Sequence, residues 1–180
     1  MAQFVYLKHT CRMWYPVGEH YLENFDYVRD AARAIHNTFP EGRLILVVRG
    51  HSGSILAGGI AYLLKRRGRD VMVSVSRKSD ESTHGSNLEG LHKNLEGDSH
   101  IIVVDDFVQS GETVLAIISD LISRLECTYF DMLCVANHWD DEDFTEEGGE
   151  RGVNSEWESN QEIASHFEYI CCNKPTNEQW

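Results

Sequence analysis

Two adjacent carboxylates and the short polar turn after them are the residues of this 180-residue chain with the clearest chemical use. Asp105 and Asp106 come directly after the apolar run 101–104, and the turn 110–113 has the sequence Ser-Gly-Glu-Thr. Carboxylate oxygens accept hydrogen bonds from sugar hydroxyls. Hydroxyl side chains and the unpaired N–H groups of a helix start bind phosphate, and Gly111 lets the chain approach such a ligand closely. The segment therefore predicts a site for a phosphorylated sugar.

Glycines and cations follow two other predicted strands. Residues 49–53 read Arg-Gly-His-Ser-Gly after the apolar run 44–48, and Arg77 and Lys78 follow the run 71–75. Arginine binds phosphate groups through two parallel hydrogen bonds, and glycines let the backbone come close to them. Because the carboxyl ends of parallel strands meet at one edge of a sheet, we expect these segments and the acidic pair to share one ligand.

The elements that must position these residues alternate between strand and helix. Short apolar runs predict buried strands at residues 44–48, 71–75, 101–104 and 130–136. Helical spacing of apolar residues, or a composition rich in Ala and Leu, predicts helices over residues 19–39, 55–67 and 114–125. Residues 77–98 would form a long polar loop, and residues 167–170 a final strand. The alternation predicts an α/β fold with right-handed parallel crossovers.

The charge and hydropathy of the chain exclude some partners. Its net charge is −13, and residues 140–180 hold −10 of it, since twelve acids there accompany only Arg151 and Lys174. Such a charge repels nucleic acid, so we expect no nucleic-acid partner. No run of 18 apolar residues is present, and residues 1–9 lack the features of a secretory signal. We therefore expect no membrane association and a cytoplasmic location.

The segment 101–113 resembles the phosphoribosyl diphosphate motif of the type I phosphoribosyltransferases. That motif consists of four apolar residues, an acidic pair, three variable residues and Thr-Gly-x-Thr. Ser110 stands at the first Thr and keeps its hydroxyl. The segments 49–53 and 77–78 occupy the places of the family's diphosphate-binding loop and of the basic pair that opens its catalytic loop. The resemblance thus extends in consistent order over about residues 44–136.

The resemblance implies a fold and a domain organisation. The fold would be α/β, with a Rossmann-like three-layer core around a mainly parallel sheet and with a small variable hood. Residues 1–180 would be a single phosphoribosyltransferase-like domain, with its core at about 19–138 and its hood formed by about 1–18 and 139–180. A homodimer is also implied.

The implied reaction transfers a 5-phosphoribosyl group from phosphoribosyl diphosphate to a nucleobase and releases diphosphate. Asp105 and Asp106 would hold the ribose, and the turn 110–113 would hold the 5'-phosphate. Mg²⁺ would be the cofactor, held mainly by the substrate, with the two aspartates as its candidate protein ligands. The implied phosphoribosyl diphosphate-binding residues are Arg49, Gly50, His51, Ser52, Gly53, Arg77, Lys78, Asp105, Asp106, Val108, Gln109, Ser110, Gly111, Glu112 and Thr113.

The segment 79–98 corresponds to the family's catalytic loop, which closes over the substrate and excludes water. Glu89 and His84 are the candidates there for a general acid or base. Orotate enzymes carry a lysine before the His-Gly pair of this loop, whereas residues 82–83 are Ser-Thr. Leu88 and Glu89 are similar to a Leu-Glu pair of the adenine enzymes. An acidic hood would repel anionic orotate and tolerate a neutral purine, so a purine acceptor is preferred.

Other interpretations of the same residues remain. Singly, the glycines, the basic pair and the acidic pair would also suit tight turns, a solvated strand end and a helix cap. A non-catalytic regulator that binds a nucleotide or phosphoribosyl diphosphate on the same fold would explain the unusual loop and the acidic tail. The receiver domain of response regulators also has a strand ending in two acids. Its acids follow the first strand, whereas Asp105 and Asp106 follow two earlier predicted strands.

Overall fold

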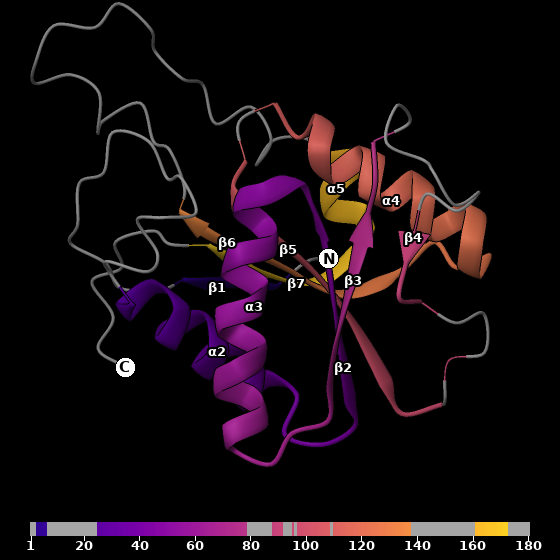
Figure 1. Cartoon of the computed structure of the whole chain (residues 1–180). Helices are drawn as coiled ribbons and strands as arrows, with labels where there is room; N and C mark the ends of the chain where they lie inside the picture. The colour runs from indigo at the N-terminus through magenta and orange to yellow at the C-terminus, as the bar shows by residue number, and fades with distance from the viewer. Residues whose placement is uncertain are drawn as a thin grey trace, which may run out of the picture.

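The computed structural model describes residues 3–6, 25–78, 88–91, 95, 97–108, 110–137 and 161–172. Within these residues, seven strands form one sheet in the order β1-β7-β6-β5-β2-β3-β4 (Figure 1). Neighbouring strands are parallel, except that β3 and β4 run antiparallel. The strands are β1 (Gln3–Tyr6), β2 (Arg43–Arg49), β3 (Val71–Ser76), β4 (Leu88–Glu89), β5 (Ser99–Phe107), β6 (Phe130–Asn137) and β7 (Phe167–Cys172). The helices are α2 (Asp26–Thr38), α3 (Gly50–Arg66), α4 (Glu112–Leu125) and α5 (Gln161–Ser165).

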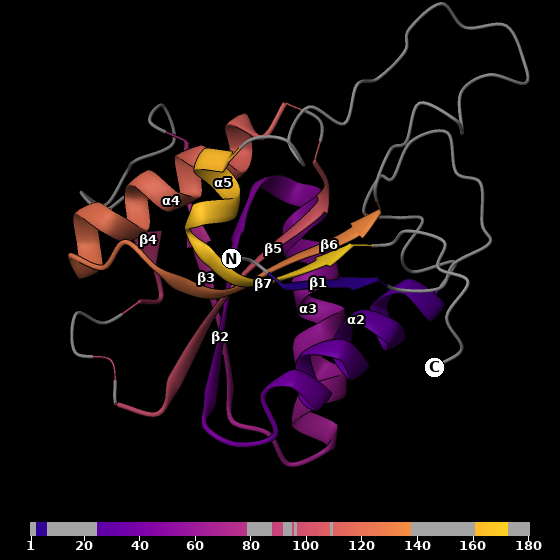
Figure 2. The same cartoon turned by 180° about the vertical axis from the view of Figure 1, so that it is seen from behind.

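The central strand β2 contributes side chains to two separate cores. Leu44, Leu46 and Val48 pack with residues of α2 and α3, whereas Ile45 and Val47 pack with residues of α4 and α5. A strand covered on both faces is apolar at successive positions, which explains the unbroken apolar run in its sequence. Figures 1 and 2 show α2 and α3 on one face of the sheet and α4 and α5 on the other. The predicted three-layer core with a mainly parallel sheet is confirmed.

The helices α2 and α3 pack closely because one glycine of α3 lacks a side chain. A Cβ atom on Gly59 would lie 2.7 Å from Cγ1 of Val28, a buried residue of α2. The neighbouring Gly58 is exposed, and a Cβ atom there would have no atom within 4 Å. The two glycines of one helix therefore differ in what a methyl group would meet.

We expect Gly59→Ala to destabilise the protein and Gly58→Ala to stabilise it. At Gly59 the methyl group overpacks the α2–α3 contact, which costs about 1–3 kcal/mol. At Gly58 alanine only improves helix propensity, by roughly 0.5–1 kcal/mol. Thermal unfolding of the two variants measures the difference. Equal shifts in the same direction would contradict the packing described here.

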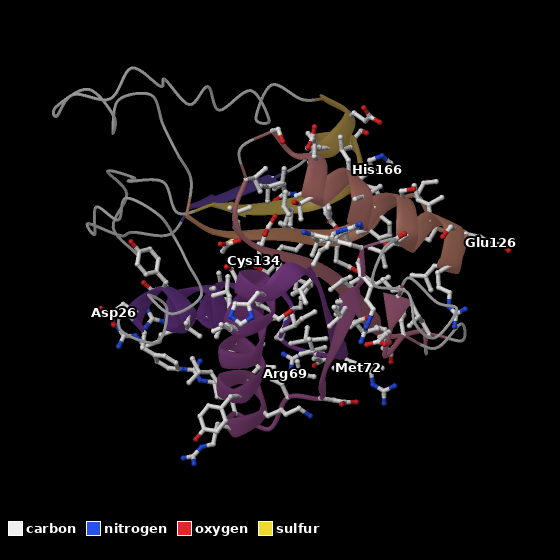
Figure 3. The ribbon with its side chains drawn as sticks, turned by 45° about the horizontal axis from the view of Figure 1, so that its top comes forward. Asp26, Arg69, Met72, Glu126, Cys134 and His166 are labelled. Carbon is white, nitrogen blue, oxygen red and sulfur yellow. The ribbon has the colours of Figure 1, made fainter. Side chains whose placement is uncertain are left out.

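Arg69 connects the two turns at the amino-terminal edge of the sheet. Its guanidinium donates hydrogen bonds to the backbone carbonyls of Phe39, Glu41 and Gly42. These carbonyls precede β2. Arg69, which is labelled in Figure 3, precedes β3. The loops before two neighbouring strands are thus fixed to each other, and the carboxyl ends of these strands lie at the opposite edge.

The structure corrects two boundaries near the predicted site. The helix α3 begins at Gly50 and not near residue 55, because the chain passes directly from β2 into the helix. Within this first turn, the hydroxyl of Ser54 donates to the carbonyl of Gly50 at 2.6 Å. The strand β5 extends to Phe107, so the acidic pair lies within the strand and not after it. The apolar run is shorter than the strand, because the acidic residues continue the backbone pairing of β5 with β6.

The two ends of the chain also contribute to the sheet. The resemblance implies a hood formed by about residues 1–18 and 139–180, and the structure places Gln3–Tyr6 and Phe167–Cys172 of these segments in the sheet, paired with each other. The strand β7 agrees with the final strand that the sequence predicts at residues 167–170. A four-residue strand is too short to show a clear alternation of apolar and polar residues, which is why the sequence does not predict β1. The two-residue β4 and the five-residue α5 were missed for the same reason. None of the helices in the described ranges has the length and apolar character needed to cross a membrane.

Candidate functional site

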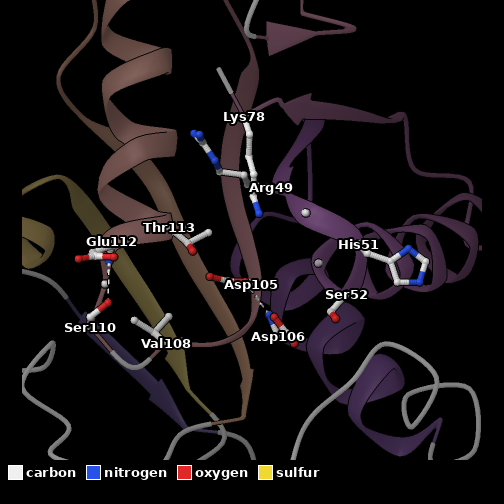
Figure 4. A pocket seen from close by; sticks show the side chains of 13 residues that line it. Arg49, His51, Ser52, Lys78, Asp105, Asp106, Val108, Ser110, Glu112 and Thr113 are labelled. Carbon is white, nitrogen blue, oxygen red and sulfur yellow. Dashed lines mark hydrogen bonds between the residues drawn. The ribbon is translucent and has the colours of Figure 1, made fainter. Parts of the chain in front are cut away.

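An open pocket with a volume of about 350 Å³ lies at the carboxyl ends of the central strands (Figure 4). Here the end of β5 lies beside the first turns of α3 and α4. Ligand sites of parallel sheets occur at this edge. The pocket is lined by Arg49, Gly50, His51, Ser52, Gly53, Lys78, Asp105, Asp106, Val108, Ser110, Gly111, Glu112 and Thr113. Each of these residues is one that the sequence predicts for the site.

The first turn of α4 forms one wall of the pocket. Gly111 precedes the helix with a φ of +79°, in the left-handed region that glycine adopts without strain. The hydroxyl of Ser110 accepts a hydrogen bond of 3.4 Å from the N–H of Glu112. Gly111 has no side chain to cap the helix, and the positive end of the α4 dipole lies at the pocket. The arrangement suits a phosphate group beside the Ser110 and Thr113 hydroxyls.

The first turn of α3 forms the opposite wall. Arg49 ends β2 in an extended conformation without capping this helix, and Gly50 follows with a φ of +81°. Gly53 lies against β5, where a Cβ atom would be 3.5 Å from the carbonyl oxygen of Val104 and 3.9 Å from Oδ1 of Asp105. The 17-residue helix directs its positive end to the same pocket as α4. Two helix starts therefore offer two separate positions for anionic groups.

Asp105 and Asp106 lie at the floor between these walls, with only 5% and 7% of their surfaces exposed. The N–H of Asp106 donates to Oδ1 of Asp105 at 3.0 Å. Burial raises the pKa of Asp105 well above its ordinary value, and the charge and side-chain hydrogen bond of Asp106 raise it further. A ligand that brings hydroxyl donors or a cation to this carboxyl would favour its ionised form.

The predicted cations lie in different surroundings. Lys78 and Arg49 line the pocket, and Figure 4 shows the ammonium of Lys78 directed into it. Arg77 is absent from the pocket lining, and its Nη2 forms a 2.9 Å ion pair with Oε2 of Glu89. Glu89 belongs to β4, which pairs with the end of β3, and it does not line the pocket either. The predicted residues His84 and Gln109 lie outside the described residues.

Two residues beside the pocket were not predicted. Asp120 of α4 accepts a 2.6 Å hydrogen bond from Ser76, the last residue of β3. The Nη1 atom of Arg49 donates to the Ser76 hydroxyl at 3.1 Å and lies 3.4 Å from Oδ2 of Asp120. The one available sequence signal was an acid among the apolar residues of a helix, three positions after Ile117. That signal does not identify a partner 71 residues away.

The oxygen atoms of the pocket suit a hard cation that is also bound by water and by oxygens of the substrate. Two adjacent carboxylates supply oxygen ligands, which Mg²⁺ prefers, together with water and phosphate oxygens. Within the described ranges, no three His, Cys, Asp or Glu side chains are grouped to hold a metal ion by themselves. Asp105 and Asp106 are therefore the described residues that fit an ion shared with a phosphorylated ligand.

Comparison with known proteins gives one family and several similar folds. The family model described as the phosphoribosyl transferase domain matches residues 19–169. An adenine phosphoribosyltransferase from Thermoanaerobacter pseudethanolicus has 13% sequence identity and a TM-score of 0.50, covering 85% of this chain and 84% of its own. At this identity the likeness concerns the fold alone.

Two further structures have lower TM-scores. A purine phosphoribosyltransferase from Pyrococcus horikoshii has 13% identity and a TM-score of 0.46, covering 98% of this chain and 95% of its own. An HGPRT-ase from Leishmania tarentolae in complex with GMP has 15% identity and a TM-score of 0.46, covering 88% and 79%. No curated protein matches the chain.

Proposed function

The chain belongs to the phosphoribosyl transferase domain family and has the type I phosphoribosyltransferase fold, and from this premise we propose that it is an active phosphoribosyltransferase. It transfers a 5-phosphoribosyl group from phosphoribosyl diphosphate to a nucleobase and releases diphosphate. The observation that carries the proposal is that two helix starts and a buried acidic pair line a single pocket. These are the features needed by a ligand with a phosphate, a sugar and a diphosphate.

Each part of the proposed substrate has a matching part of the pocket. The 5'-phosphate binds at the first turn of α4, where Ser110 and Thr113 supply hydroxyls. The ribose hydroxyls donate to Asp105 and Asp106. The diphosphate lies against the first turn of α3 and the cation of Lys78, with Arg49 beside them. This distribution is supported by the positions of these residues in one pocket.

The chemical step separates charge at the anomeric carbon of the ribose. Positive charge develops on the sugar while the bond to the diphosphate breaks, so the nearby carboxylates stabilise the sugar and the cations stabilise the leaving group. Hydrogen bonds from the substrate favour the ionised form of Asp105, whose pKa burial raises in the ligand-free protein. Mg²⁺, held by Asp105, Asp106 and the substrate, would spread the negative charge of the diphosphate.

The preferred acceptor in this proposal is a neutral purine. The chain carries −10 of its −13 net charge in residues 140–180, and an anionic base such as orotate would be repelled by it. His84 and Glu89 stay candidates for the general acid or base. For Glu89 this role requires that its ion pair with Arg77 opens.

Nucleotide formation tests the proposal. We expect the purified protein, with phosphoribosyl diphosphate and Mg²⁺, to convert one purine base of a panel of purines and pyrimidines into its 5'-monophosphate. The double variant Asp105→Asn/Asp106→Asn is the control, and it should lose this activity. Binding of phosphoribosyl diphosphate without turnover of any base would replace the proposal by a non-catalytic regulator, which the Ser-Thr sequence at residues 82–83 favours. Absence of both binding and turnover would contradict the proposal and the regulator alike.

A further inference from the structure

Three polar side chains from three different elements meet beside the pocket. Ser76 ends β3, Asp120 lies in α4, and Arg49 ends β2. The Ser76 hydroxyl donates to Oδ2 of Asp120 at 2.6 Å and accepts a hydrogen bond of 3.1 Å from Nη1 of Arg49. The same Nη1 lies 3.4 Å from Oδ2 of Asp120. Each member of the cluster thus contacts the other two.

The burial of the Asp120 carboxylate is energetically unfavourable unless the group has a partner. Its side chain is only 15% exposed, and it lies between the buried residues Ile117 and Leu121 on α4. Ser76 is 1% exposed. A carboxylate removed from water to this extent requires a cation or hydrogen-bond donors, and Arg49 and Ser76 supply them. An apolar residue at position 120 would pack the helix without this requirement, so the acid suggests a role toward Arg49.

Ser76 and Asp120 contact the guanidinium of Arg49 through its Nη1 atom. The hydrogen bonds involve Nη1 alone, and no described residue accepts a hydrogen bond from Nε or Nη2. Arg49 also lines the pocket, and Figure 4 shows its side chain directed toward α4 beside Lys78. Since the guanidinium is planar and rigid, fixing one nitrogen fixes the direction of the others. The N–H groups of Nε and Nη2 are therefore not used within the cluster.

We propose that Asp120 and Ser76 are positioning residues, which orient the guanidinium of Arg49 for the diphosphate of the substrate. This inference rests on the proposed function, because it needs an anionic ligand in the pocket. Asp120 itself does not line the pocket and acts through Arg49. Its contribution is that Arg49 meets the diphosphate in a fixed orientation, without the loss of side-chain freedom that a mobile arginine undergoes on binding.

The sign of the effect separates positioning from simple electrostatics. Asp120→Ala removes a negative charge near the pocket, which by charge alone would strengthen the binding of an anion. Loss of positioning weakens the binding instead. We expect the affinity for diphosphate to fall about tenfold, the effect of one charge-assisted hydrogen bond that is no longer well oriented. Asp120→Asn keeps an acceptor oxygen for Ser76 and Arg49, so it should retain part of the affinity.

The other end of β2 provides a matched control. Arg43 begins this strand and forms a 2.7 Å ion pair with Asp70, both of them more exposed than Arg49 and Asp120. Asp70→Ala removes the same charge and an arginine ion pair from the same strand, at the edge opposite the pocket. It should leave diphosphate affinity within about twofold of the wild type, since an exposed ion pair contributes little.

Calorimetric titration of the full chain with inorganic diphosphate and Mg²⁺ tests the inference. Wild type and Asp70→Ala should bind alike, Asp120→Ala and Ser76→Ala about tenfold more weakly, and Asp120→Ala should have no further effect in an Arg49→Ala background. In turnover, the KM for phosphoribosyl diphosphate should rise while the KM for the base stays unchanged.

The outcomes are distinguishable. Unchanged or tighter binding by both Asp120→Ala and Ser76→Ala, beside a binding wild type, overturns the positioning role and leaves the proposed function intact. A wild type that binds neither diphosphate nor phosphoribosyl diphosphate overturns the proposed function and the inference together. If Asp120→Ala fails to fold, Asp120→Asn and Ser76→Ala decide between the same outcomes.

Discussion

Asp105→Asn should make the ligand-free protein more stable while it removes activity. The carboxyl is buried beside Asp106, and its raised pKa shows that the charged form is disfavoured in the folded chain. An amide has the same shape and still accepts the hydrogen bond from the N–H of Asp106. We expect an increase of about 1 kcal/mol in the free energy of unfolding at pH 7, or about 2–4 °C in Tm. The value of kcat/KM should fall about 10²–10³-fold, because a charge that stabilises the transition state is lost.

The pH dependence of stability follows from the direction of the pKa shift. An aspartate has a pKa of about 3.9 in an unfolded chain, and the folded-state pKa of Asp105 is higher. At a pH between these two pKa values, Asp105 is protonated more often in the folded state than in the unfolded state. The contribution of Asp105 to stability is therefore present at low pH, and it declines as the pH rises through the folded pKa. This decline should be missing from the Asn variant.

Thermal unfolding of wild type and Asp105→Asn between pH 4 and 8 measures the effect. Asp98→Asn is a suitable control, since this exposed acid lies just before the same strand. Its Tm should stay close to that of the wild type at each pH. An Asp105→Asn variant with a lower Tm than the wild type at pH 7 would contradict the burial and charge repulsion described here.

Gly111→Val should weaken the binding of the 5'-phosphate without affecting the binding of free diphosphate. Gly111 has a φ of +79°, which a β-branched residue adopts only with about 1–3 kcal/mol of strain. Relief of that strain would rotate the turn before α4 and misplace its N–H groups. We expect the affinity for a nucleoside 5'-monophosphate to fall about 10–100-fold, the equivalent of that strain energy. Diphosphate, which we place at α3, should bind as before.

The other end of α4 offers a control with the same backbone conformation. Glu126, which is labelled in Figure 3, follows the helix with a φ of +57°. Gly111 and Glu126 flank opposite ends of α4. Glu126→Gly removes the backbone strain of a non-glycine residue in the left-handed region. It should leave the affinities for the nucleoside 5'-monophosphate and for diphosphate unchanged. Competition titrations with the two ligands measure the effect. Equal loss of affinity for both ligands in Gly111→Val would show that the two helix starts do not bind separate groups.

The pocket could be predicted from the sequence because its parts lie at the carboxyl ends of buried strands. Three apolar runs indicate the strands β2, β3 and β5, and parallel crossovers bring the carboxyl ends of these strands to one edge of the sheet. Gly50, Lys78 and Asp105, which lie far apart along the chain, therefore line one pocket. The apolar runs and the parallel crossovers predict this shared edge, and the resemblance to the type I phosphoribosyltransferases implies the individual residues.

Contacts between distant side chains could not be predicted in the same way. Asp120 meets Arg49 only because α4 crosses the sheet with one particular rotation about its axis, which the apolar pattern defines too coarsely. The resemblance implies that Arg77 binds the ligand together with Lys78, and in the structure Arg77 also forms an ion pair with Glu89 of β4. A two-residue strand has no periodic pattern, so neither β4 nor this ion pair could be predicted from the sequence.

A crystal structure of the protein with phosphoribosyl diphosphate and Mg²⁺ would show how the substrate lies in the pocket. We expect the 5'-phosphate at the first turn of α4 beside Ser110 and Thr113, and the ribose hydroxyls on Asp105 and Asp106. The diphosphate should lie at the first turn of α3. A ligand bound elsewhere, or an empty pocket in a crystal grown with saturating ligand, would contradict this expectation.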